Sequence, residues 1–178
     1  MKWIELTNDP NDFKVREIML KHINSLKKKY NGTWDSFIVE NVKGKKTLDI
    51  GIVEHNREYI KSKNWLHKKI SKNSSYCLGI DILTDLVDFI KSKGYNVRVA
   101  DATSNEFLGE KFERINIGDV IEHVNNPIDL LSFAKRHLEK EGEIVVTTPN
   151  PFYFKYFYRV IVKKSLIVNF DHVNWVTP

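Results

Sequence analysis

Between residues 47 and 148 the chain alternates short apolar runs with amphipathic stretches, and this alternation restricts the possible folds more than any other feature. Apolar runs rich in β-branched residues predict strands at 47–50, 76–81, 96–100, 112–117 and 143–148. Amphipathic stretches predict helices at 56–70, at 84–93 and after Asn126-Pro127. Strands that alternate with helices form right-handed βαβ units, so the pattern predicts an α/β fold with a doubly wound, mostly parallel sheet.

Two of the predicted helices have a recognisable inward face and a glycine stop signal. The helix at 84–93 would end at Gly94 and turn inward Leu86, Val87 and Ile90. The helix after Asn126-Pro127 would end at Gly142 and bury Leu130, Leu131, Ala134 and Leu138.

The first 44 residues lack this alternation and predict helices only. A helix is expected at 10–29, starting at Asp9-Pro10 and ending before Asn31-Gly32. One face of that helix would carry Val15, Met19, Ile23 and Leu26. A second short helix is expected at 34–42, ending near Gly44. We therefore expect an N-terminal helical segment, residues 1–44, packed on a main domain formed by residues 45–178.

Composition excludes several classes of protein. No apolar run reaches the roughly 18 residues that a membrane span needs, and the start of the chain lacks a signal-peptide pattern. Cys77 is the only cysteine, which leaves no disulfide framework and no thiolate metal site. We therefore expect a cytoplasmic protein. The net charge of +5 comes from scattered lysines, which are typical of a solvated surface, so a nucleic-acid partner is not expected.

Polar or small residues follow the predicted strands, at the edge where doubly wound sheets bind ligands. Asp81 ends the second strand, where a carboxylate can accept from both hydroxyls of a ribose; the alternative is a helix N-cap. Asp101 ends the third strand and could accept from an adenine amino group, while the Ala102 N–H donates to a ring nitrogen; the alternative is a turn aspartate. Gly51 ends the first strand and would allow a ligand to approach the backbone closely.

The order of these motifs resembles that of class I S-adenosylmethionine (SAM)-dependent methyltransferases. The matching segments are Leu-Asp-Ile-Gly at 48–51, Gly-Ile-Asp at 79–81, Ala-Asp-Ala at 100–102, Gly-Asp-Val-Ile-Glu-His at 118–123 and the fifth-strand region at 138–151. The resemblance covers roughly residues 46–177 and is closest to the branch that includes ubiquinone-type O-methyltransferases and small enzymes that modify glycans and lipids.

The resemblance implies a Rossmann-like fold, SAM as cofactor, and methyl transfer to a small-molecule, glycan or lipid acceptor at oxygen. It implies cofactor-binding roles for Asp49, Gly51, Asp81, Ile82, Asp101, Ala102, Gly118 and Asp119. The alternative function is a non-catalytic protein with this fold that binds a partner or nucleic acid. A dinucleotide site is disfavoured because Gly51 lacks the further glycines of a G-x-G-x-x-G loop.

The sequence departs from the family pattern in two places. Val53 and His55 stand where the first loop usually has its second and third glycines. Since a β-branched residue resists positive φ, either the loop has another shape or SAM lies further away. The family fold also has closing antiparallel strands, for which this sequence has no residues after Pro178, so we expect a truncated or a minimal version.

His123 is the expected general base, since an imidazole with a pKa near about 6.5 suits proton removal at neutral pH. Glu122 or Asp119 could orient it; the alternative is a structural histidine. In ubiquinone-type relatives a similar array is implied to bind a divalent ion such as Mg²⁺, here through Asp119, Glu122 and His123, with His172 as a possible further ligand.

Aromatic residues crowd 152–158 and an apolar run follows at 166–170. These stretches are expected to form either a lid over the site or part of the core. The neighbouring pair Lys163-Lys164 could meet a phosphate or a membrane surface.

Overall fold

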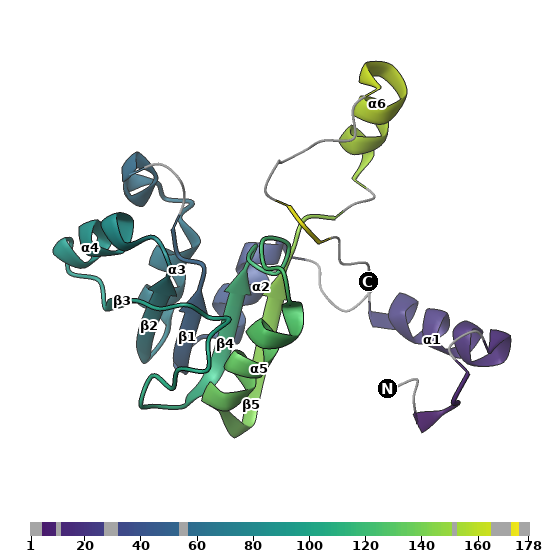
Figure 1. Ribbon diagram of the computed structural model, residues 1–178, viewed down its shortest axis with the longest axis horizontal. Coiled ribbons are helices and arrows are strands. Elements are labelled where there is room, and N and C mark those ends of the chain that lie inside the picture. The colour runs from purple at the N-terminus through teal and green to yellow at the C-terminus, as the bar shows by residue number, and fades with distance from the viewer. Residues whose placement is uncertain are drawn as a thin grey trace. The chain divides into compact units, whose positions relative to one another are not determined.

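The computed structural model describes residues 5–9, 12–26, 32–53, 57–150, 153–164 and 172–174 of the chain. The chain divides into two compact units, Met1–Phe37 and Ile38–Pro178. The first unit holds α1 (Phe13–Leu26) and the start of α2 (Trp34–Asn41), and the second holds the sheet and the later helices (Figure 1). The boundary expected between residues 44 and 45 stays a prediction.

The second unit is built on a sheet of five parallel strands. They are β1 (Lys46–Ile50), β2 (Tyr76–Asp81), β3 (Val97–Val99), β4 (Phe112–Gly118) and β5 (Leu138–Thr147). Their order in the sheet is β3-β2-β1-β4-β5, which confirms the predicted doubly wound, Rossmann-like architecture. The chain reverses its direction of strand addition between β1 and β4, so a ligand crevice is expected at the carboxyl ends of these two strands.

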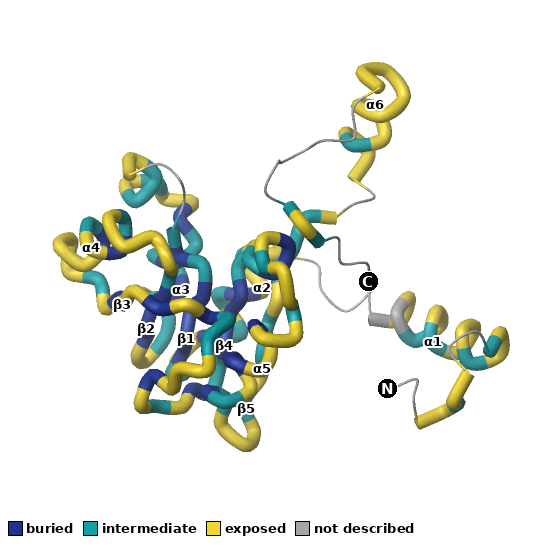
Figure 2. Tube along the Cα trace, viewed as in Figure 1, coloured by how far each residue is buried: buried dark blue, intermediate teal, exposed yellow. Residues whose placement is uncertain are grey.

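The central strands carry the core. Leu48, Ile80 and Ile117 are 0% exposed, and Figure 2 shows buried positions concentrated along β1, β2 and β4. Helix α5 (Pro127–His137) adds Leu130 and Phe133 to the same apolar cluster. Strands buried on both faces read as nearly continuous apolar runs, which explains why the sequence predicts them well.

A second cluster forms around Trp65 and receives Val87 and Ile90 from α4 (Thr84–Ser92). These two residues are inward as predicted, and Leu86 is half-buried. A third cluster joins Ile38 of α2 to Ile70 of α3 (Leu66–Asn73). No helix among the described residues is long and apolar enough to cross a bilayer.

The predicted end of α5 at Gly142 is wrong. The helix ends at His137, and Leu138 already begins β5. The buried face is Leu130, Phe133, Ala134 and His137, whereas Leu131 is 39% exposed. The backbone of the C-cap residue Leu138 is extended. At the last residue of the helix, the His137 Nδ1 donates to the Phe133 carbonyl at 2.8 Å and Nε2 accepts from the Leu108 N–H at 2.8 Å.

The single helix predicted at 56–70 is also wrong. A 3₁₀ turn, η2 (Arg57–Lys61), is separated from α3 by Trp65, whose backbone is extended. Trp65 is 2% exposed, and its indole N–H donates to the Ile52 carbonyl at 2.9 Å. Burying this large side chain beneath the first loop interrupts the helix. Residues 54–56 lie outside the described part of the chain.

Several other expectations fall partly outside the described residues. The helix expected at 10–29 is seen as α1, and Pro10 and residues 27–31 are not among the described residues. Phe152 and residues 165–171, which belong to the segments expected to form a lid or part of the core, also lie outside the described residues. Residues 154–158 of the aromatic stretch at 152–158 lie in α6 (Phe154–Lys163).

A buried carboxylate links three elements below the sheet edge. Asp49 of β1 is 2% exposed and accepts from the Asn116 side chain of β4 at 2.6 Å. Its other oxygen lies 2.8 Å from Nδ1 of His67 in α3, which is also 2% exposed. A Cβ atom on Gly79 would come within 2.5 Å of His67 Cε1, so the imidazole fits only because β2 has a glycine there.

The end of β1 closely approaches the loop that follows β4. Gly51 has φ of +82°, and a Cβ there would lie 2.2 Å from Val120 Cγ2 and 2.9 Å from the Gly118 carbonyl oxygen. Gly94 has a similar φ of +88°, but a Cβ there would meet nothing within 4 Å. Both glycines therefore adopt a backbone conformation that would strain another residue, but only at Gly51 would an added side chain also clash with neighbouring atoms.

Gly51→Ala should lower the free energy of unfolding by about 3 kcal/mol, since it adds a clash to the cost of a left-handed alanine. Gly94→Ala, the matched control, should cost only about 1 kcal/mol because it meets the backbone cost alone. Urea unfolding of both variants measures the difference. Equal losses would show that the approach between the two loops is not tight.

Asp49→Ala should destabilise the fold by about 2–4 kcal/mol, because it leaves two buried polar side chains without their acceptor. Asp85→Ala removes an exposed carboxylate of α4 and should change stability by less than about 0.5 kcal/mol. Chemical denaturation with circular dichroism compares the two. A loss for Asp49→Ala no larger than the control's would contradict the structural role of this network.

Candidate functional site

A pocket of about 550 Å³ opens at the carboxyl edge of the sheet. Its walls come from the loops after β1, β2, β3 and β4 and from the start of α5. Most of the sequence-predicted site residues line it, namely Gly51, Asp81, Ile82, Asp101, Ala102, Gly118, Asp119 and His123. Asp49 and Glu122 do not line it. The volume lies within the range of about 300–1,000 Å³ typical of small-molecule sites.

Asp81 holds the loop that follows β1. One carboxylate oxygen accepts from the Val53 N–H at 3.1 Å, and the other accepts from the Leu83 N–H at 3.1 Å. The N-cap of α4 is Leu83, which has no side-chain cap, so Asp81 is not the N-cap that the alternative interpretation expected. Asp81 also lines the pocket, at the end of β2.

The glycine-poor first loop takes its shape from these contacts. Among the described non-glycine residues, only Asp119 and Lys164 have positive φ, so Val53 avoids the strained region. The Asp81 carboxylate and the Trp65 indole fix the backbone of residues 52 and 53 instead. The choice between another loop shape and a more distant SAM stays a prediction. His55 lies outside the described residues.

Asp101 and its neighbours form the adjacent wall. One oxygen of Asp101 accepts from the Thr103 N–H at 2.7 Å and from the Thr103 hydroxyl at 2.6 Å. The turn role is thus present, and the exposed carboxylate still lines the pocket. Ala102 is 7% exposed and packs into the core cluster below.

The loop after β4 makes the opposite wall. Asp119 has φ of +49°, and its N–H donates to the Thr147 carbonyl at 3.2 Å. This left-handed turn leads into the short segment that holds Glu122 and His123. A non-glycine residue in that region is uncommon and is often found at functional sites.

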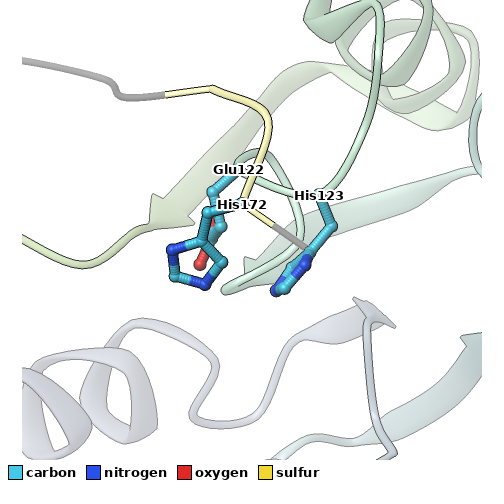
Figure 3. A group of neighbouring side chains, drawn as sticks. All are labelled: Glu122, His123 and His172. Carbon is cyan, nitrogen blue, oxygen red and sulfur yellow. The ribbon is translucent and has the colours of Figure 1, made fainter. Parts of the chain in front are cut away.

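Glu122, His123 and His172 form a cluster beside the pocket (Figure 3). One potential ligand atom from each lies within 4.8 Å of the others. Glu122 is 2% exposed, and neither of its carboxylate oxygens has a hydrogen-bond partner in the described part of the chain. Burial raises the pKa of Glu122, with a further contribution from the Asp119 charge, while the two histidines act in the opposite direction.

His172 reaches the cluster because its neighbours bind the loop after β4. The N–H groups of Val173 and Asn174 donate to the Glu122 carbonyl at 2.8 and 3.2 Å. The Asn174 side chain also donates to the Val124 carbonyl. The rings of His123 and His172 are nearly perpendicular, with centroids 4.8 Å apart. The structure therefore brings His172 to the predicted site, whereas Asp119 is not a member of this cluster.

Sequence reasoning missed the polar start of α5. Asn125, Asn126 and Asp129 also line the pocket. The Asn126 side chain caps α5 by accepting from the Ile128 N–H at 3.1 Å, and it donates to Asp129 at 2.8 Å. An Asn-Asn-Pro run directly after the fourth strand's loop is the signal that could have indicated them, because it puts a helix start at the ligand edge of the sheet.

Comparison with known proteins points to one family. Residues 62–146 match the family described as methyltransferase domain. An uncharacterized protein of Methanocaldococcus jannaschii is 27% identical over 78 residues, which are 44% of this chain and 38% of that protein.

Solved structures share the fold. A SAM-dependent methyltransferase from Clostridium acetobutylicum is 16% identical with a TM-score of 0.51, over 76% of this chain and 58% of that chain. The plantazolicin methyltransferase BpumL, solved in complex with a monoazolic desmethylPZN analog and SAH, is 18% identical with a TM-score of 0.52, over 71% of this chain and 49% of that chain.

The chain thus spans 38% of the curated relative and 49–58% of these two structures. The matches do not single out the ubiquinone-type branch. They agree with the order of motifs along the strands and with the all-parallel sheet. Residues 62–146 thus match the methyltransferase domain family, and the sheet has the fold of class I SAM-dependent methyltransferases.

Proposed function

We propose that the chain binds SAM and transfers its methyl group to an oxygen atom of a small-molecule, glycan or lipid acceptor. One observation carries the proposal: Asp81 and Asp101, from the ends of adjacent parallel strands, line the same pocket at the edge where the strand order reverses. The cytoplasmic location expected from the sequence belongs to the same proposal. The non-catalytic alternative has no observation in its favour.

The pocket residues fit SAM group by group. The Asp81 carboxylate, an acceptor that lines the pocket, suits the ribose hydroxyls, and Asp101 with the Ala102 N–H suits an adenine edge. Ile82 is 65% exposed and offers an apolar surface next to Asp81. The relative BpumL was solved with SAH, which supports a cofactor of this kind. When bound, SAM supplies an activated methyl group, so the chain's residues need mainly to position the acceptor and remove its proton.

Acceptor deprotonation is assigned to His123, the imidazole that lines the pocket. It acts either directly as a general base or as one ligand of a metal ion. The buried, unpartnered Glu122 carboxylate facing two histidines favours the second possibility. Two imidazoles and one carboxylate suit a transition-metal ion such as Zn²⁺, whereas Mg²⁺ prefers oxygen ligands and retained waters.

Asp81→Ala should weaken SAM and SAH binding about 10–100-fold, because it removes charge-assisted hydrogen bonds to the ligand. Isothermal titration calorimetry measures the affinity, and Asp85→Ala serves as a control with the same change of charge. Asp81→Asn keeps an acceptor oxygen and should lose less. Binding by Asp81→Ala that equals wild type would refute the assigned ribose contact. A folded wild-type chain that binds neither ligand would refute the proposed function.

The two roles of His123 make different predictions for metal binding. If the cluster holds an ion, calorimetry with Zn²⁺ should show one site that His172→Ala and Glu122→Gln weaken at least about tenfold. Asp88→Asn, an exposed position of α4, is the control and should leave that affinity unchanged. With Co²⁺ as a spectroscopic probe, wild type alone should give visible absorption bands. No Zn²⁺ binding by the wild-type chain would leave His123 as the direct base.

A further inference from the structure

Helix α6 has an exposed apolar face that runs its full length. The face is made of the side chains of Phe154, Phe157, Tyr158, Ile161 and Val162, which are 78%, 53%, 52%, 72% and 57% exposed. At 100° per residue these five positions fall within an arc of about 140°. Figure 2 shows α6 as exposed along most of its length. Contiguous exposed apolar surface of this kind marks a site of interaction.

Basic side chains form a stripe along one border of that face. Lys155, Arg159 and Lys163 are spaced four residues apart, so they lie above one another on the helix, and all three are exposed. Lys164 follows as the C-cap in the left-handed conformation. Residues 151–164 contain no Asp or Glu. The helix therefore presents positive charge with no compensating negative charge of its own.

This combination is complementary to an anionic lipid surface. Interfacial helices carry Lys and Arg on the polar face and bulky apolar or aromatic side chains on the other, and they lie in the plane of the headgroups. Phenolic rings, such as that of Tyr158, favour the boundary between water and hydrocarbon. A protein partner would need a groove rimmed by acidic residues, whereas a leaflet with anionic headgroups supplies the charge and the apolar layer together.

The length of α6 decides between spanning and lying on a bilayer. Its 10 residues rise about 15 Å, roughly half of the hydrocarbon thickness. We propose that α6 is a membrane-surface helix that binds anionic phospholipid bilayers, with Phe154 and Ile161 inserted at the headgroup boundary and the basic stripe on lipid phosphates. This inference goes beyond the proposed methyl transfer and does not depend on it, because lipid binding requires neither SAM nor an acceptor.

Vesicle co-sedimentation of the full chain tests the proposal. Vesicles of phosphatidylcholine with added phosphatidylglycerol should bind the protein, and pure phosphatidylcholine should bind it weakly. The triple variant Lys155→Gln, Arg159→Gln, Lys163→Gln should lose about fivefold in partitioning for each cation removed. A matched control removes three exposed lysines from other elements, Lys91, Lys111 and Lys140, and should retain most of the binding.

Insertion of the apolar face of α6 into the bilayer can be measured separately from vesicle binding. Cys77 is buried and burial raises the pKa of its thiol, so a second cysteine can be labelled selectively with an environment-sensitive dye. A dye at Ile161→Cys should shift to the blue with anionic vesicles, whereas one at Arg159→Cys should shift less. Phe154→Ser with Ile161→Ser should reduce binding at unchanged charge.

Three results would overturn the proposal. The first is no binding to anionic vesicles by a folded chain. The second is an equal loss in the control triple variant, which would show that overall charge and not α6 governs binding. The third is concentration-dependent dimerisation abolished by Phe154→Ser with Ile161→Ser, without lipid binding, which would assign the face to a second copy of the chain. Titration of SAM into each variant checks the proposed function separately.

Discussion

The buried carboxylate of Asp49 is the interaction on which the rest of the structure depends. It joins the middle strand of the sheet to α3 through His67 and to β4 through Asn116. These contacts lie directly below the point where β1 and β4 end and the strand order reverses. A buried carboxylate is costly unless it is hydrogen-bonded, so its contacts with His67 and Asn116 fix the relative positions of three elements. The pocket above it then has a rigid floor.

The first loop has Val53 and His55 at the positions where the sequence resemblance predicts glycines. Asp81 ties the Val53 backbone to β2, and the Trp65 indole ties residue 52 from beneath. Among residues 51–53, the described part of this loop, positive φ occurs only at Gly51, where the loop meets Val120. The described residues of this loop are held by side-chain hydrogen bonds. The same carboxylate then serves the scaffold and, in the proposed function, the cofactor.

The sheet could be predicted because buried parallel strands leave apolar runs, and the strand-end aspartates could be predicted because topology brings strand ends together. The failures have tertiary causes. Helix α5 ends where Leu138 joins the sheet beside Phe112, 26 residues earlier in the chain, and the helix predicted at 56–70 is interrupted at the buried Trp65. Local periodicity also cannot tell that Asp49 points to His67, or that Glu122 turns away from the pocket toward His172.

The short segment at residues 172–174 binds a loop that lies 50 residues earlier in the chain, between Asn174 and Val124. During synthesis, β1 to β5 leave the ribosome first and can form the sheet before this segment emerges. The wall with the two histidines is therefore the last part of the site to be completed during synthesis.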